Sequence, residues 1–162
     1  MKSRARSTLL ISNIVLLAAL ILIAQSQKGS AVGTWKLDTQ KSDFAGMPAP
    51  KDLTVVVTED TKDKVSWKLG GTGPDGKKLS ESFSGAVDGK PHPITGSERS
   101  ESVSYTRNPD GTVSSVTTDK SGNEVAHSSL TRSDDGKTMT IKGTRKTPNG
   151  ELNYTEVFTR LK

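Results

Sequence analysis

The chain has 162 residues, a formal net charge of +5 and no cysteine. Four of its basic residues and none of its acidic residues lie within the first 31 positions, which leaves residues 32–162 with 19 basic and 18 acidic side chains. This nearly neutral balance excludes a basic nucleic-acid-binding surface. The absence of cysteine excludes disulfides and lipid attachment at a cysteine, so the folded part depends on its core and its strand pairing.

The first residues are typical of an export signal. Three basic residues come first: Lys2, Arg4 and Arg6. A stretch of 16 residues follows, from Leu9 to Ala24, that is apolar except for Ser12 and Asn13, whereas a membrane-spanning helix needs about 20. We therefore predict a helical signal peptide over residues 1–26, with cleavage as late as residue 31 as an alternative, and a secreted or periplasmic protein. An uncleaved segment would instead anchor the domain to the membrane, facing outside the cytoplasm.

Residues 32–162 have the pattern of antiparallel strands. Turn sequences such as Pro74-Asp75-Gly76 recur, and apolar and polar residues alternate between them. The pattern predicts nine strands, over 33–38, 52–58, 63–70, 77–85, 99–107, 111–119, 123–131, 137–145 and 151–160. The segment 86–98 could add a tenth strand, although Pro91 and Pro93 favour an edge strand or a loop. Short connections make consecutive strands hairpins, so we predict one all-β domain, an up-and-down antiparallel barrel of 8–10 strands.

The two ends of this domain carry features that fit together. Gly33 and Trp35 lie on the first predicted strand, and Arg160 lies on the last. A guanidinium stacked on an indole is worth about 0.5–2 kcal/mol. Pairing of the first strand with the last also removes both edges of the sheet. Because residues 32–162 contain few large apolar side chains, we expect such a closed sheet, with Gly33, Trp35 and Arg160 as the closing residues.

A Gly-x-Trp on the first strand with a basic residue on the last resembles the calycin group, which includes lipocalins and fatty-acid-binding proteins. The resemblance implies a lipocalin-like barrel in which Trp35 closes the floor, while Arg160 packs on the indole and bonds nearby backbone. The opening Gly33-Thr34-Trp35-Lys36-Leu37 is also similar to that of small exported bacterial proteins. Two departures weigh against a fatty acid ligand. Residues 39–51 are too short for the helix pair of fatty-acid-binding proteins, and Phe158-x-Arg160 stands where they carry Arg-x-Tyr.

Several charged residues share the parity of the apolar positions. They are Glu81, Glu101, Arg107, Arg145, Glu156 and Arg160. Buried charges need partners, so these residues either pair near the barrel ends or anchor a ligand inside. We predict an exported barrel that binds a small hydrophobic or amphipathic molecule, with a ligand site that includes Trp67, Tyr105, Arg107 and Arg145. The alternative is a non-catalytic structural or interaction domain of the cell envelope with a filled barrel.

No catalytic or metal-binding pattern stands out, so we predict neither an enzyme nor a cofactor. The two histidines, His92 and His127, are too few to supply three or four zinc ligands in a chain without cysteine. A cavity that holds His127 beside a carboxylate would favour catalysis instead. We expect a monomer whose partner is a small molecule, with no nucleic acid partner. Only an uncleaved signal segment would bring it into contact with a membrane.

Overall fold

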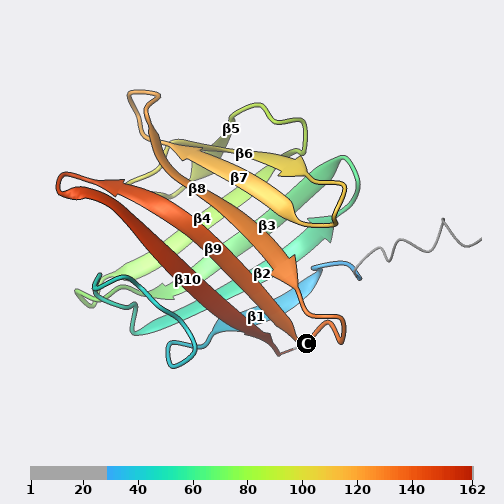
Figure 1. Cartoon of the computed structure of the whole chain (residues 1–162), viewed down its shortest axis with the longest axis horizontal. Helices are drawn as coiled ribbons and strands as arrows, with labels where there is room; N and C mark the ends of the chain where they lie inside the picture. Colours follow the sequence, from blue (N-terminus) through green and yellow to red (C-terminus); the bar gives the residue numbers. More distant parts are fainter. Residues whose placement is uncertain (1–28, 162) are drawn as a thin grey trace, which may run out of the picture.

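Ten antiparallel strands follow one another around a closed barrel (Figure 1). The computed structural model describes residues 29–161. The strands are β1 (Gly33–Leu37), β2 (Asp52–Asp60), β3 (Lys64–Thr72), β4 (Lys78–Ala86), β5 (His92–Thr95), β6 (Ser102–Arg107), β7 (Val113–Thr118), β8 (Glu124–Arg132), β9 (Thr138–Thr147) and β10 (Gly150–Arg160). Consecutive strands pair with each other, and β1 also pairs with β10. The sheet therefore has no free edge strand.

The predicted all-β, up-and-down barrel is confirmed. The tenth strand is β5, which lies in the segment 86–98. Pro93 is tolerated there because β5 is short and pairs with each neighbouring strand at only two positions. No helix of residues 29–161 is long and apolar enough to cross a membrane. The predicted signal segment, 1–26, lies outside the described residues.

The hairpin turns use the Asp-Gly chemistry that the sequence indicates. In the turn between β7 and β8, the Asp119 carboxylate accepts hydrogen bonds from the N–H groups of Ser121 and Asn123 at 2.8 and 2.9 Å. Gly122 has a φ of 79° in the same turn, a conformation that side chains with a Cβ rarely adopt. Such turns fix the register of each hairpin, and the register decides which residues face the interior.

The connection between β1 and β2 contains no helix and lies against β10. The Asp38 N–H donates to the Val157 carbonyl oxygen at 2.8 Å, and Asp43 forms an antiparallel bridge with Thr155. Phe44 packs against the buried core from the same connection. The helix pair that fatty-acid-binding proteins place here is thus absent from the connection between β1 and β2. The short length of residues 39–51 predicts this absence.

The buried core surrounds β1. Trp35 and Phe158 are its largest fully buried side chains. The cluster packed with them comprises Ala31, Leu37, Leu53, Val57 and Met139. All six residues of β7, by contrast, keep intermediate exposure. Side chains therefore pack densely around β1 and less densely along β7.

A β-bulge on β2 decides which acidic residue faces the interior. Val55 and Val57 point into the core, but the register with β3 shifts between Val57 and Glu59. One extra residue in a strand reverses the parity of the residues beyond it. The shift turns Asp60 inward, where its side chain is only 5% exposed.

Candidate functional site

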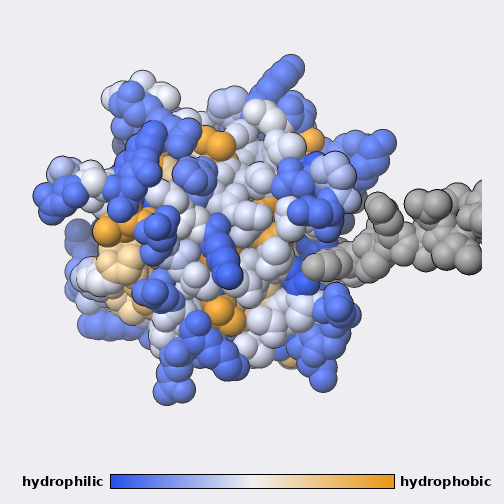
Figure 2. All heavy atoms as spheres, in the orientation of Figure 1, coloured by the Kyte–Doolittle hydropathy of each residue, from blue (hydrophilic) through white to orange (hydrophobic). Residues whose placement is uncertain are grey.

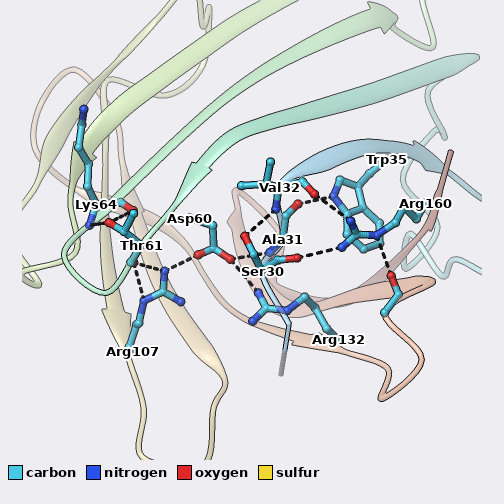
Figure 3. A network of polar contacts seen from close by, with 11 residues as sticks. Ser30, Ala31, Val32, Trp35, Asp60, Thr61, Lys64, Arg107, Arg132 and Arg160 are labelled. Carbon is cyan, nitrogen blue, oxygen red and sulfur yellow. Dashed lines mark hydrogen bonds and ion pairs between the residues drawn. The ribbon is translucent and has the colours of Figure 1, made fainter. Parts of the chain in front are cut away.

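One end of the barrel, where the chain enters β1, is closed around Trp35 and Arg160 (Figure 3). The guanidinium carbon of Arg160 lies 4.3 Å from the centroid of the Trp35 ring. Arg160 also donates to the carbonyl oxygens of Gly136, Val32 and Ser30, at 2.7, 2.8 and 2.9 Å respectively. These contacts join the N-terminal segment, the turn after β8 and the end of β10.

Gly33 begins β1 beside this stack. Its φ of 145° lies in the region that L side chains rarely adopt. Trp35, two residues later, pairs in register with Arg160 on β10 and with Val55 on β2. The backbone at Gly33 therefore leads the N-terminal segment into a strand that is paired on both sides.

An acidic residue holds the N-terminal segment in place at the same end. The Asp60 carboxylate accepts a hydrogen bond from the Ala31 N–H at 2.6 Å, and it forms ion pairs with Arg107 and Arg132. Burial alone would raise the pKa of Asp60. Hydrogen bonds from Ala31 and Arg107, with the charges of both arginines, outweigh burial and lower that pKa. The carboxylate therefore stays ionised between its two arginines.

Residues upstream of position 32 thus contribute to the folded domain. Ala31 is only 6% exposed, and its carbonyl oxygen accepts a hydrogen bond from the Trp35 indole N–H at 2.7 Å. Ser30 supplies one of the carbonyl oxygens that Arg160 binds. Cleavage of a signal segment after residue 31 would remove all of these contacts, whereas cleavage after residue 26 would keep them.

Arg107, which the sequence suggests as a ligand residue, belongs to this closed end. Its guanidinium is paired with Asp60 and also donates to the Thr61 carbonyl oxygen. Sequence parity does not indicate Asp60, because the bulge reverses its orientation, nor Arg132, because the predicted strand ends at residue 131. Glu101, which has inward parity in the sequence, precedes β6 and is exposed. Arg107 is therefore paired at the closed end, and Glu101 is exposed before β6.

Trp67 and Tyr105 meet inside the barrel. The Trp67 indole N–H donates to the Tyr105 hydroxyl oxygen at 3.0 Å. Phe83 stacks on Trp67 with a centroid separation of 5.9 Å and meets Tyr105 edge to face at 5.2 Å. Phe83 is buried, but Trp67 and Tyr105 keep intermediate exposure, unlike the fully buried Trp35. These three rings from β3, β4 and β6 form one aromatic wall.

The hydroxyl group of Tyr105 is available as a hydrogen-bond donor. Burial raises the pKa of Tyr105 to about 12, so the phenol is neutral at physiological pH. Its oxygen already accepts a hydrogen bond from Trp67. A phenol has one hydrogen to donate, and no residue in the range 29–161 accepts it. Tyr105 can therefore present that hydrogen to an acceptor on a ligand.

Arg145 and Glu156 add two opposite charges to the interior. The Arg145 guanidinium carbon lies 5.6 Å from the centroid of the Tyr154 ring, and Glu156 follows two residues later on β10. Among residues 29–161, Arg145 donates no hydrogen bond and Glu156 accepts none. Burial raises the pKa of Glu156, and the charge of Arg145 opposes this rise without cancelling it. The two charges therefore flank Tyr154 without forming an ion pair.

Gly143 gives Tyr154 its position. A Cβ at Gly143 would lie 2.7 Å from the Tyr154 hydroxyl oxygen and 2.5 Å from the His127 carbonyl oxygen. The ring can lie across β9 only because Gly143 has no side chain. Burial, followed by the charge of Glu156, raises the pKa of Tyr154, and this phenol is also neutral at physiological pH. Tyr105 and Tyr154 belong to one row of register partners that runs through Ser115, Ser128 and Gly143, so the two tyrosines face the same interior.

The outer surface offers no comparable site. His127 points outward on β8, with its Nδ1 atom 3.5 Å from a Glu124 oxygen, so the arrangement that would favour catalysis does not occur in the interior. Residues 29–161 contain no group of three or more His, Cys, Asp or Glu that could hold a metal ion. One hollow lies over β2 and β3, and a second, over β7–β10, has Gly143 and Tyr154 in its lining; neither includes the aromatic wall. The face in Figure 2 is mostly hydrophilic or neutral, with small separate hydrophobic spots.

No protein-family model matches the chain, and no curated protein matches its sequence. Its fold is nevertheless similar to that of solved structures. A point mutant of the fluorescent protein UnaG gives a TM-score of 0.58 at 17% identity, over 81% of this chain and 96% of that one. Zebrafish ileal bile acid-binding protein, complexed with cholic acid, gives a TM-score of 0.53 at 13% identity, over 82% and 100% of the two chains. At these identities the likeness concerns the fold alone, and it agrees with the closed barrel of ten antiparallel strands.

Proposed function

We propose that this protein is exported and that its barrel binds a small hydrophobic or amphipathic molecule, without catalysing a reaction. The observation that carries the proposal is the aromatic wall of Trp67, Phe83 and Tyr105, which lies inside the barrel but is not sealed. Ligand sites combine such walls with a few polar groups, and Tyr105 and Arg145 supply these groups here. Barrels of this size can hold one small ligand. The cholic acid bound to the zebrafish protein of similar fold supports this proposal.

Tryptophan fluorescence tests the binding, because the chain has only two tryptophans. Trp67 belongs to the proposed site, whereas Trp35 is fully buried at the closed end. A bound molecule should change the emission of Trp67, and the Trp67→Phe variant should lose that change while the emission of Trp35 remains. The probes are bile acids, haem, pigments and single-chain lipids, with native mass spectrometry to establish stoichiometry. If no probe binds and the protein carries no endogenous molecule from its own host, the proposal is wrong.

Export has a separate test. Cell fractionation should find the protein outside the cytoplasm, and an intact-mass measurement should show loss of residues 1–26. Cleavage at that point would retain Ser30 and Ala31, which contact Arg160 and Asp60 at the closed end. A full-length protein in the membrane fraction would instead support the anchored alternative, and a full-length soluble protein in the cytoplasm would refute export.

The alternative function is a non-catalytic structural or interaction domain of the cell envelope with a filled barrel. The fully buried cluster around Trp35 favours it, because that part of the interior has no room for a ligand. Under this alternative the barrel would bind none of the probes. A specific protein partner from the cell envelope would instead be recovered with the intact protein.

A further inference from the structure

Two opposite charges inside the barrel, Arg145 and Glu156, distinguish its interior from a simple apolar pocket. Both residues face inward at intermediate exposure, on the adjacent strands β9 and β10. Arg145 pairs in register with Leu152, which lies four residues before Glu156. At about 3.3 Å per residue, the two backbone positions are roughly 13 Å apart along β10. Tyr154 lies between these two positions on β10, and no hydrogen bond or ion pair joins the Arg145 and Glu156 side chains.

At the closed end, each charged side chain that stabilises the fold has hydrogen-bond or ion-pair partners. Asp60 has two arginines and a backbone N–H as partners, and Arg160 has three carbonyl oxygens. Arg145 and Glu156 have no such partners within residues 29–161. A buried or half-buried charge without a partner lowers stability, and apolar residues in its place are often neutral or stabilising. The Tyr154 ring offsets part of this cost for Arg145, but neither charge has a hydrogen-bond or ion-pair partner within residues 29–161 that would explain it structurally.

We propose that the barrel binds a zwitterionic amphiphile, whose anionic group contacts Arg145 and whose ammonium group contacts Glu156. This inference rests on the proposed ligand-binding function and specifies the class of ligand. An arginine fork suits an anionic oxygen, and a carboxylate beside an aromatic ring suits an ammonium group. Tyr154 lies between the two charges, and Tyr105 of the aromatic wall is in the same row of register partners, so the wall accommodates the apolar part of the ligand.

A set of probes with one chain length and different head groups tests the inference. The probes are dodecylphosphocholine, dodecyl phosphate, dodecyltrimethylammonium and dodecyl maltoside, each below its critical micelle concentration. Isothermal titration should show that the zwitterion binds the wild-type protein at least tenfold more tightly than the other three. In the Arg145→Gln variant, dodecylphosphocholine should bind no more tightly than dodecyltrimethylammonium, which lacks the anionic group. In the Glu156→Gln variant, it should bind no more tightly than dodecyl phosphate, which lacks the ammonium group.

Glu81→Gln is the matched control. Glu81 also has inward parity and intermediate exposure, but it lies on β4 in register with Leu69, whereas Tyr154 lies on β10 in register with Gly143. This variant should keep the wild-type order of affinities. An equal loss in the Glu81 and Glu156 variants would overturn the assignment to Glu156. Thermal melts of all three variants establish that each one is folded.

The affinities of the wild-type protein for the four probes are sufficient to test the zwitterion inference. The test therefore remains valid if a variant fails to fold. Four similar affinities would overturn the zwitterion inference and leave the proposed function standing. The inference is equally wrong if the anion binds most tightly and Glu156→Gln strengthens its binding. If none of the probes binds and the wider ligand screen also fails, the proposed function itself is wrong and the inference falls with it.

Discussion

Replacement of Arg160 by alanine tests the closure of the barrel most directly. The substitution removes the guanidinium that lies 4.3 Å from the Trp35 ring and donates to three carbonyl oxygens. These contacts connect the N-terminal segment, the turn after β8 and the last strand. Their loss should weaken the junction of the first strand, the last strand and an adjacent turn.

The magnitude follows from the environment of each contact. A cation stacked on a desolvated ring contributes up to about 2 kcal/mol, and Trp35 is fully buried. The hydrogen bond to Gly136 is partly buried and is worth about 1.5 kcal/mol, the lower end of the range for a charged donor. The bonds to Val32 and Ser30 are exposed, and water can replace much of their contribution. We therefore expect a loss of about 3 kcal/mol, more than the stack alone would contribute.

Thermal and urea unfolding measure this loss. For a domain of this size, about 3 kcal/mol corresponds to a fall in Tm of roughly 10 °C. Arg160→Lys should show an intermediate loss, because lysine keeps the charge but lacks the planar fork. Arg99→Ala is the matched control: Arg99 is exposed, and no contact of it is found in residues 29–161, so stability should change by less than about 0.5 kcal/mol. Equal melting temperatures for wild type and Arg160→Ala would refute the closing role.

Four further predictions concern other parts of the barrel. Gly143→Ala should displace the Tyr154 ring and lower the free energy of unfolding by about 1–3 kcal/mol in urea titrations. Asp60→Asn should cost about 3 kcal/mol at neutral pH, because two arginines lose their counter-charge. A chain that begins at Val32 should melt well below one that begins after residue 26, because it loses the N–H donor to Asp60. In absorbance titrations, Tyr105 should ionise near pH 12 in the folded protein and near pH 10 in denaturant.

The controls and the pH dependence follow from the same contacts. Gly70→Ala is the control for Gly143, because a Cβ at Gly70 would meet nothing closer than 4.0 Å, and an equal loss in both variants would contradict the Tyr154 argument. The pKa of Asp60 is lowered in the folded protein, so its contribution is present above about pH 3.9 and is lost as the pH falls through the lowered value. Asp60→Asn should lack that acid transition. The pKa of Tyr105 is raised, so its contribution is present below about pH 10 and is lost as the pH rises towards 12.

The fold could be predicted because its signals are local. Alternation with a period of two and Asp-Gly turns identify each hairpin separately, and short connections order the hairpins around the barrel. The strand β5 has a weaker signal in the sequence, since it has four residues and includes Pro93. β5 pairs with the backbone groups of β4 and β6 that no other strand uses. Which groups these are is decided by the closed sheet and not by the sequence of β5. Barrel closure by β1 and β10 could be proposed because Trp35 and Arg160 stand at opposite ends of the chain.

The site could be predicted only in part, because its geometry depends on where a strand bends or ends. Trp67, Tyr105 and Arg145 have inward parity in the sequence, and the structure brings Trp67 and Tyr105 together. The partner that removes Arg107 from the site is Asp60, which faces inward only because of a bulge. Nothing in the composition of β2 indicates that bulge, since it accommodates twist and register among several strands at once.

The arginines of inward parity show why position along a strand matters more than parity. Arg107 and Arg160 stand at the ends of β6 and β10, where turns and the N-terminal segment present carbonyl oxygens. Backbone carbonyl groups within a paired strand are already used by the neighbouring strands, so an arginine farther from the turns finds no such acceptor. Arg145 is in this position on β9, and its contact with residues 29–161 is the Tyr154 ring. The guanidinium group of Arg145 therefore has no hydrogen-bond acceptor within residues 29–161 and can bind one on a ligand, whereas Arg107 and Arg160 close the barrel.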